Sequence, residues 1–293
     1  MLTREGCRAR QERFRQRLAA GGLSGAVISA PRDIYYFTGL LAEGQWSLLY
    51  LPVEGRSWLA TWTEEGAPLV DDRLLYDWHV LYTINPDNHR RLAETVKKAA
   101  TGTRGGRLGY QRESLTFALA NALSESAAPD QWVEVDETLQ ELQRCKDPDE
   151  IDCIRRATAA VLAGYERAAA VIRPGVREID VLTECQQAAQ RRTGAVHHYG
   201  GDFQSGAFGG PARDRVIEAG ELYIIDAQAD VDGYWCDNSR TWVVGGEPTP
   251  LQREVHAHIA AVLRAVPQMI RPGESRSQFW RALDARIREH PHL

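Results

Sequence analysis

The sequence lacks the patterns that mark membrane and secreted proteins. It has no apolar run of the roughly 20 residues that a membrane helix needs. Its first twenty residues hold six arginines and no apolar stretch, unlike a secretory leader. We therefore expect a cytoplasmic protein without a membrane partner.

Strong charge and cysteine motifs are also missing. The formal net charge is only -5, and acidic and basic residues are interspersed, which argues against nucleic acid as a partner. The five cysteines form no Cys-x-x-Cys pair, which is typical of reduced thiols in a cytosol. No glycine-rich phosphate loop and no nucleophilic serine or cysteine motif occurs.

The chain is long enough for two domains, and its composition is that of a globular protein. It has 293 residues, of which 43% are hydrophobic. Residues 1–140 predict an α/β domain in which helices alternate with short apolar strands. We expect helices at 4–20, 89–100 and 115–128, strands at 24–29, 47–52, 58–63 and near Leu108, and a turn at 34–39.

Residues 141–293 predict a second domain with an internal repeat. A long helix is expected from Asp147 to Ile172, because an acidic cap and a proline stand at its first turn. The tetrapeptide Ile-Arg-Pro-Gly ends this helix at 172–175 and recurs at 270–273, again between two helical stretches. Proline stops a helix and glycine permits the turn, so the repeat predicts two related halves.

Between the two copies lies a predicted β-hairpin that carries two aspartates. Asp226 ends an apolar strand, Asp237 lies in the next strand, and Asp-Gly at 232–233 is a turn signal. A turn centred just before Asp232 would set the two aspartates directly opposite each other. A turn centred on 232–233 would make them diagonal neighbours, and both registers keep them on one face.

Two like charges on one face repel unless a cation or a proton lies between them. The pair therefore predicts a metal site, against the simpler interpretation that both aspartates are solvated turn and strand-end residues. Arg240 lies an odd number of residues from Asp237, so it points to the other face. Ser239 and Thr241 share the face of Asp237 and are expected to orient the ligands. Gln228 shares the face of Asp226 and is a candidate to hydrogen-bond a ligand.

These residues resemble the creatinase/prolidase/aminopeptidase P family of M24 metallopeptidases. The resemblance rests on Asp226 followed by Gly233-Tyr234-x-x-Asp237-x-x-Arg240-Thr241. The segments 33–39 and 145–151 are also similar to the family's N-terminal domain and to the start of its catalytic domain. The resemblance implies a creatinase-like α/β domain followed by an α+β pita-bread domain, which is incomplete in this chain.

The resemblance also implies an activity. Family members bind two divalent ions, commonly Mn, Co or Zn, through two aspartates, one histidine and two glutamates, and the ions activate water to cleave an Xaa-Pro bond. Only Asp226 and Asp237 have counterparts here, and we expect the other ligands to come after Leu293. A peptide or small amide is the implied substrate, and a homodimer is the implied assembly.

The chain departs from the family pattern near the pair. Gln228 replaces a usual glycine, and the expected substrate-binding histidine is missing from the stretch 208–211. His197 and His198 stand in a glycine-rich segment before the hairpin and are candidates for lining a pocket. Two rival hypotheses stay open: a catalytically silent binding module, and a creatinase-like amidinohydrolase or lyase on the same scaffold.

Overall fold

We describe a computed structural model of the chain, covering residues 1–293 except 43, 45, 79, 82 and 102–105. The chain divides into two compact units. Unit 1 comprises Met1–Ala160, Ala195–His198 and Ala229–Cys236, and unit 2 comprises Val161–Gly194, Tyr199–Gln228 and Asp237–Leu293. None of the helices in the described part of the chain combines the length and the apolar character needed to span a membrane.

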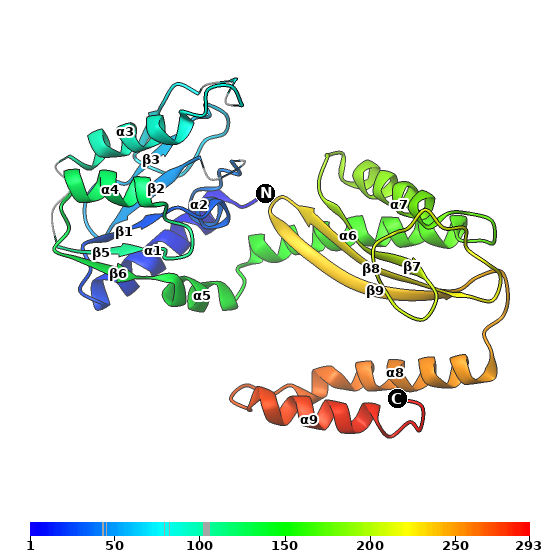
Figure 1. Ribbon diagram of the computed structural model, residues 1–293. Coiled ribbons are helices and arrows are strands. Elements are labelled where there is room, and N and C mark those ends of the chain that lie inside the picture. Colours follow the sequence, from blue (N-terminus) through cyan, green and yellow to red (C-terminus); the bar gives the residue numbers. More distant parts are fainter. Residues whose placement is uncertain (43, 45, 79, 82, 102–105) are drawn as a thin grey trace. The chain divides into compact units, whose positions relative to one another are not determined.

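Unit 1 is built on a six-stranded mixed sheet with helices on both faces (Figure 1). The strand order is β4-β3-β2-β1-β5-β6, and only the β1–β2 and β2–β3 pairs are antiparallel. The strands are β1 (Gly25–Ile28), β2 (Leu48–Pro52), β3 (Trp58–Thr61), β4 (Asp72–Leu75), β5 (Arg107–Tyr110) and β6 (Gln131–Glu134). The helices are α1 (Arg4–Ala20), α2 (Pro31–Thr38), α3 (Asn88–Ala100), α4 (Phe117–Ser126) and α5 (Asp136–Arg144).

The two faces of this sheet bury separate apolar clusters. Phe14, Phe37 and Leu139 from α1, α2 and α5 pack on one face, and Val96 and Leu123 from α3 and α4 pack on the other. All four residues of β1 and all five of β2 are buried, as expected for central strands covered on both sides. The α/β architecture predicted for this unit is confirmed.

The expected turn at 34–39 is wrong, because these residues belong to helix α2. Pro31 begins this helix, at a position where a backbone N–H would have no acceptor within the helix, so proline loses no hydrogen bond there. Gly39 ends the helix with a left-handed φ of 74°. The buried ring of Phe37 packs against Phe14 at 5.0 Å between centroids. The helix is only eight residues long and most of its side chains are buried, so its sequence lacks the spacing of apolar residues that marks a longer helix.

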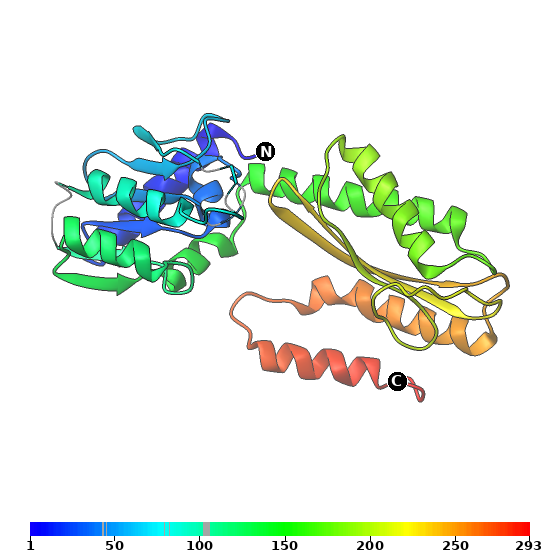
Figure 2. The ribbon, with the colours of Figure 1, turned by 45° about the horizontal axis from the view of Figure 1, so that its top comes forward.

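Most of a three-stranded sheet, β7-β8-β9, belongs to unit 2, and helices cover one face of it (Figure 2). Its strands are β7 (Tyr199–Ser205), β8 (Leu222–Val231) and β9 (Tyr234–Val243). Helix α6 (Pro148–Val171) begins in unit 1 and ends in unit 2, and α7 (Glu178–Thr193) comes next in the chain. The repeated Pro-Gly turn then separates α8 (Pro250–Met269) from α9 (Arg276–Ile287).

The two Ile-Arg-Pro-Gly copies adopt the same local geometry. Gly175 and Gly273 have φ values of 90° and 86°, and each lies between the end of one helix and the start of the next. The predicted role of the repeat as a helix-to-helix turn is confirmed. The second helical pair is far less covered: in α8 only Val262 is buried, and α9 has no buried residue.

Candidate metal centre

The hairpin formed by β8 and β9 presents one buried and one open face. Along β8 every second residue from Tyr223 to Val231 is buried, whereas Asp226 and Gln228 on the other face are half-buried. Asp237 lies on an exposed position of β9. Alternation of side chains along a strand therefore sends both aspartates to the open face.

The turn of the hairpin selects one of the two predicted registers. Asp232 and Gly233 both have positive φ, 54° and 75°, as in a two-residue turn of type I′. At the other end of the hairpin, the Val244 amide donates to the Glu221 carbonyl at 2.9 Å, as this register requires. Asp226 and Asp237 are therefore diagonal neighbours.

The carboxyl groups of Asp226 and Asp237 lie within hydrogen-bonding reach of each other. Burial raises the pKa of Asp226, and the charges of Asp237 and Asp202 raise it further. Within the described part of the chain, neither aspartate forms an ion pair with a basic side chain. Two carboxylates that face each other without a cation are a donor set suited to a divalent ion.

Arg240 does not neutralise the pair. Its guanidinium lies over the ring of Tyr165, 5.5 Å from the centroid, and donates to the Ser239 carbonyl at 2.6 Å. Tyr165 belongs to α6, which covers the buried face of the sheet. The predicted orientation of Arg240 away from the aspartates is confirmed.

The polar neighbours of the pair have different surroundings. Gln228 stands opposite Asp237 in this register, and the Ser239 hydroxyl donates to the Ile225 carbonyl at 3.3 Å. Thr241 is exposed on the same face. These three residues remain candidates for the surroundings of a bound ligand.

His197 and His198 are grouped with the tip of the hairpin, in unit 1. The His197 Nδ1 donates to the His198 carbonyl at 2.9 Å, and the His198 ring lies 5.2 Å from that of Trp235. Burial raises the pKa of Asp230, and the Gly233 amide and the two nearby imidazoles oppose that rise. The structure therefore places the two histidines next to Asp230.

Sequence reasoning missed a third carboxylate, Asp202 on β7. It contributes to the raised pKa of Asp226, so it stands near the pair on the neighbouring strand. Strand β7 comes close to β8 at this point: a Cβ added to Gly201 would overlap the Asp226 carbonyl. The sequence held one signal, the glycine pair at 200–201, which indicates a close approach of backbones.

Three carboxylates are still not a complete cage. Among the described residues, no group of three or more His, Cys, Asp or Glu side chains is arranged to hold a metal ion. Asp226 and Asp237 are neighbouring carboxylates, and their role as metal ligands stays a prediction.

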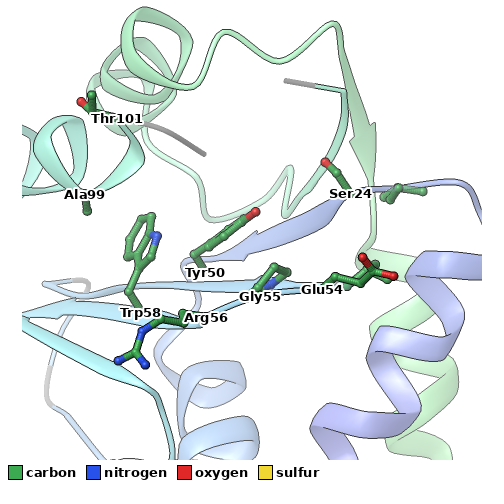
Figure 3. Close-up of a pocket in the computed structure, with 11 residues that line it drawn as sticks. Ser24, Tyr50, Glu54, Gly55, Arg56, Trp58, Ala99 and Thr101 are labelled. Atoms are coloured by element: carbon green, nitrogen blue, oxygen red, sulfur yellow. The ribbon is translucent and has the colours of Figure 1, made fainter. Parts of the chain in front are cut away.

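A separate cavity of about 680 Å³ lies in unit 1 and is lined by none of these carboxylates (Figure 3). The rings of Tyr50 and Trp58 lie on one side, tilted by 31° with their centroids 5.4 Å apart. Ala99, near the end of α3, and Thr101, just after that helix, lie on another. Arg56 at its rim already pairs with Asp72 through two hydrogen bonds of 2.6 and 2.9 Å. The charged residues of its lining are thus Arg56, which is already paired, and Glu54.

Two family models match almost the whole chain. Residues 10–145 match the creatinase/prolidase N-terminal domain, and residues 152–292 match metallopeptidase family M24. The match to the second model includes both aspartates of the hairpin and both helical pairs of unit 2.

Curated relatives and solved structures agree with these models. The chain is 25% identical over 188 residues to the uncharacterized peptidase YqhT of Bacillus subtilis, covering 63% of this chain and 52% of that protein. It is 28% identical over 152 residues to Xaa-Pro aminopeptidase of Escherichia coli, covering 50% of this chain and 34% of that protein. The prolidase of Pyrococcus horikoshii OT3 shares the fold, with a TM-score of 0.74, 18% identity and coverage of 96% of this chain and 78% of that one.

The predicted fold class, a creatinase-like α/β domain followed by a pita-bread domain, is confirmed by these neighbours. The chain spans about half the length of YqhT and about a third of the E. coli aminopeptidase. A family of metallopeptidases implies divalent metal ions. The chain therefore belongs to metallopeptidase family M24, with a creatinase/prolidase N-terminal domain preceding its M24 domain.

Proposed function

We propose that this chain is part of an Xaa-Pro peptidase in which Asp226 and Asp237 are ligands of a pair of divalent metal ions. The observation that supports it most directly is the proximity of these two carboxyl groups on the open face of a hairpin, without a basic partner in the described part of the chain. The names of several neighbours, an Xaa-Pro aminopeptidase and prolidases among them, support the choice of substrate.

The chain's own residues would hold and shape the site. Asp226 and Asp237 would bind the ions through their carboxylate oxygens, the ligand type that Mn²⁺ prefers. Bound ions would supply a water of lowered pKa as the nucleophile. Asp202 would add negative charge near Asp226, and Gln228 would offer an amide opposite Asp237.

The division into domains is also a proposal. We place a creatinase/prolidase-like domain at 1–140 and the first part of the M24 domain at 141–293. The boundary is supported by the end of α5 at Arg144 and by the limits of the two matched family models. The homodimer, the cytoplasmic location and the identity of the metal stay predictions.

Metal content of the purified chain tests the function. We expect Mn²⁺ or Zn²⁺ to bind the unaltered protein, and Asp237→Ala to weaken binding by at least tenfold, because one of the two ligands is lost. Asp152→Ala is the matched control, since Asp152 is an exposed carboxylate paired with Arg155 on the surface of α6. Equal metal binding by all three proteins would contradict the proposed role of Asp237 as a metal ligand.

A further inference from the structure

We propose that Glu150 and Tyr234 are positioning residues for Asp237: their hydrogen bond holds the tip of the hairpin and so fixes the strand that carries the aspartate. The inference rests on the proposed function, because it takes Asp237 as a metal ligand. Tyr234 is the first residue of β9, and Asp237 comes three residues later. Three residues of a strand span roughly 10 Å, so a displacement at Tyr234 is carried directly to Asp237.

The hydrogen bond pairs the Tyr234 hydroxyl with a buried carboxylate, that of Glu150. The Tyr234 hydroxyl donates to Glu150 Oε1 at 3.0 Å, and Glu150 is 1% exposed. The other carboxylate oxygen accepts from the Asp147 amide at 2.8 Å. Burial raises the pKa of Tyr234, and the charge of Glu150 raises it further, so the phenol stays a donor. A buried carboxylate that loses one of its two donors is left partly unsatisfied, which is unfavourable.

Glu150 itself stands on a rigid base, the first turn of α6. The buried guanidinium of Arg10 on α1 donates to both oxygens of Asp149, at 2.9 and 3.1 Å, and to the Tyr36 carbonyl at 2.8 Å. Thr3 adds two hydrogen bonds to Asp149 from its amide and hydroxyl. Burial alone would raise the pKa of Asp149, but these donors hold it at about 2. These contacts anchor the first turn of α6, which carries Glu150.

Further contacts keep the tip from rotating about this bond. The rings of Tyr35 and Tyr234 meet edge to face, with centroids 6.4 Å apart. Gly233 lies against Tyr35 and Leu41, leaving little room for a Cβ. Asp232 pairs with the Arg156 guanidinium and with the amino terminus. The hairpin tip is thus held on several sides, and all these residues belong to unit 1.

The position of the Asp237 side chain depends mainly on the backbone of the hairpin. Its position on β9 is exposed, and its side chain has no basic partner in the described part of the chain. The backbone after it is held by the Tyr165 hydroxyl, which donates to the Asn238 carbonyl. Asp237 therefore takes its place from backbone held at Tyr234 on one side and at Asn238 on the other.

Affinity for Mn²⁺, measured by titration calorimetry on the full chain, tests the inference. We expect Tyr234→Phe to weaken binding about tenfold, within the range seen when residues behind metal ligands are changed. Tyr76→Phe is the matched control: it removes another buried phenol, which donates to the Trp46 carbonyl at 2.8 Å in unit 1. It should lower the melting temperature to a similar extent and leave the affinity unchanged.

Glu150→Gln provides the conservative comparison. The amide oxygen of glutamine still accepts from the Tyr234 hydroxyl, although its NH2 group cannot accept from the Asp147 amide, so stability should fall while the affinity stays within about threefold of the unaltered protein. A loss of Mn²⁺ affinity as large as that of Tyr234→Phe would overturn the inference that this hydrogen bond positions Asp237. So would an affinity of Tyr234→Phe within twofold of the unaltered protein. If the unaltered protein binds no Mn²⁺, the proposed function fails instead, and the two failures are thereby distinguished.

Discussion

Two groups of carboxylates in this chain have opposite surroundings. Glu178, at the start of α7, is fully buried and accepts hydrogen bonds from Arg213, from the Ser205 hydroxyl and from the amides of both residues. Asp226 and Asp237 are more exposed, yet they face each other without a basic partner among the described residues. The fold therefore satisfies the carboxylate that it buries most deeply and leaves unpaired the two that stand on an open face.

The pKa values express the same contrast. Burial alone would raise the pKa of Glu178, but its donors outweigh burial and hold it at about 2. The pKa of Asp226 is raised by burial and by its acidic neighbours. Unpaired charge that lowers stability is typical of binding and catalytic sites, whereas paired charge is typical of structural networks.

The largest effect that sharpens this comparison is expected at Glu178. Glu178→Ala should lower the free energy of unfolding by about 3 kcal/mol, because it leaves the Arg213 Nε and two amides without their acceptor. Urea unfolding measures the loss. Glu184→Ala on the same helix is the control, since its pair with Arg167 is exposed and should contribute less than about 1 kcal/mol. Equal losses in both variants would contradict the contrast.

Acid should weaken the structure in a defined range. Glu178 and Asp149 both have pKa values lowered to about 2, so each contributes stability above its ordinary pKa, near 4, that is lost as pH falls towards 2. We expect the free energy of unfolding to be level above about pH 5 and to fall below it. Glu178→Gln should reduce the slope of that fall, and an unchanged slope would show that other carboxylates cause it.

The smallest effect is expected at the open face, and it has the opposite sign. Without metal at pH 7, Asp226→Asn should stabilise the protein by less than about 1 kcal/mol, because it removes a repelling charge that solvent partly screens. Thermal unfolding in the presence of a chelator measures the gain. With Mn²⁺ added, the order should reverse, since only the unaltered protein binds the ion. Asp214→Asn is the control, because Asp214 pairs with Arg177 and has no charge repulsion to relieve. It should show neither change.

Local patterns in the sequence were enough to predict several features of the structure. Alternation along β8 and β9 and the Asp-Gly turn set Asp226 and Asp237 on one face and directed Arg240 to the other. The helices that begin at Arg4 and Pro148 carried clear start signals. These features depend on residues close together in the chain.

The features that the sequence did not reveal depend on contacts between distant segments. Asp202 comes near Asp226 only because β7 pairs with β8, and Glu150 meets Tyr234 across 84 positions of sequence. The edge strands β4 and β6 were missed as well, since each is four residues long and neither is fully buried. No periodicity within such short stretches distinguishes a strand from a loop.

The close approach of β7 to β8 at Gly201 limits how this site can change. The gap beside Asp226 is set by main chain meeting main chain, so no side-chain exchange nearby can widen or narrow it. Variation that alters selectivity must therefore arise from the side chains that project above the strands. A library aimed at new substrates would keep Gly201 constant and diversify Asp202, Gln228 and Thr241.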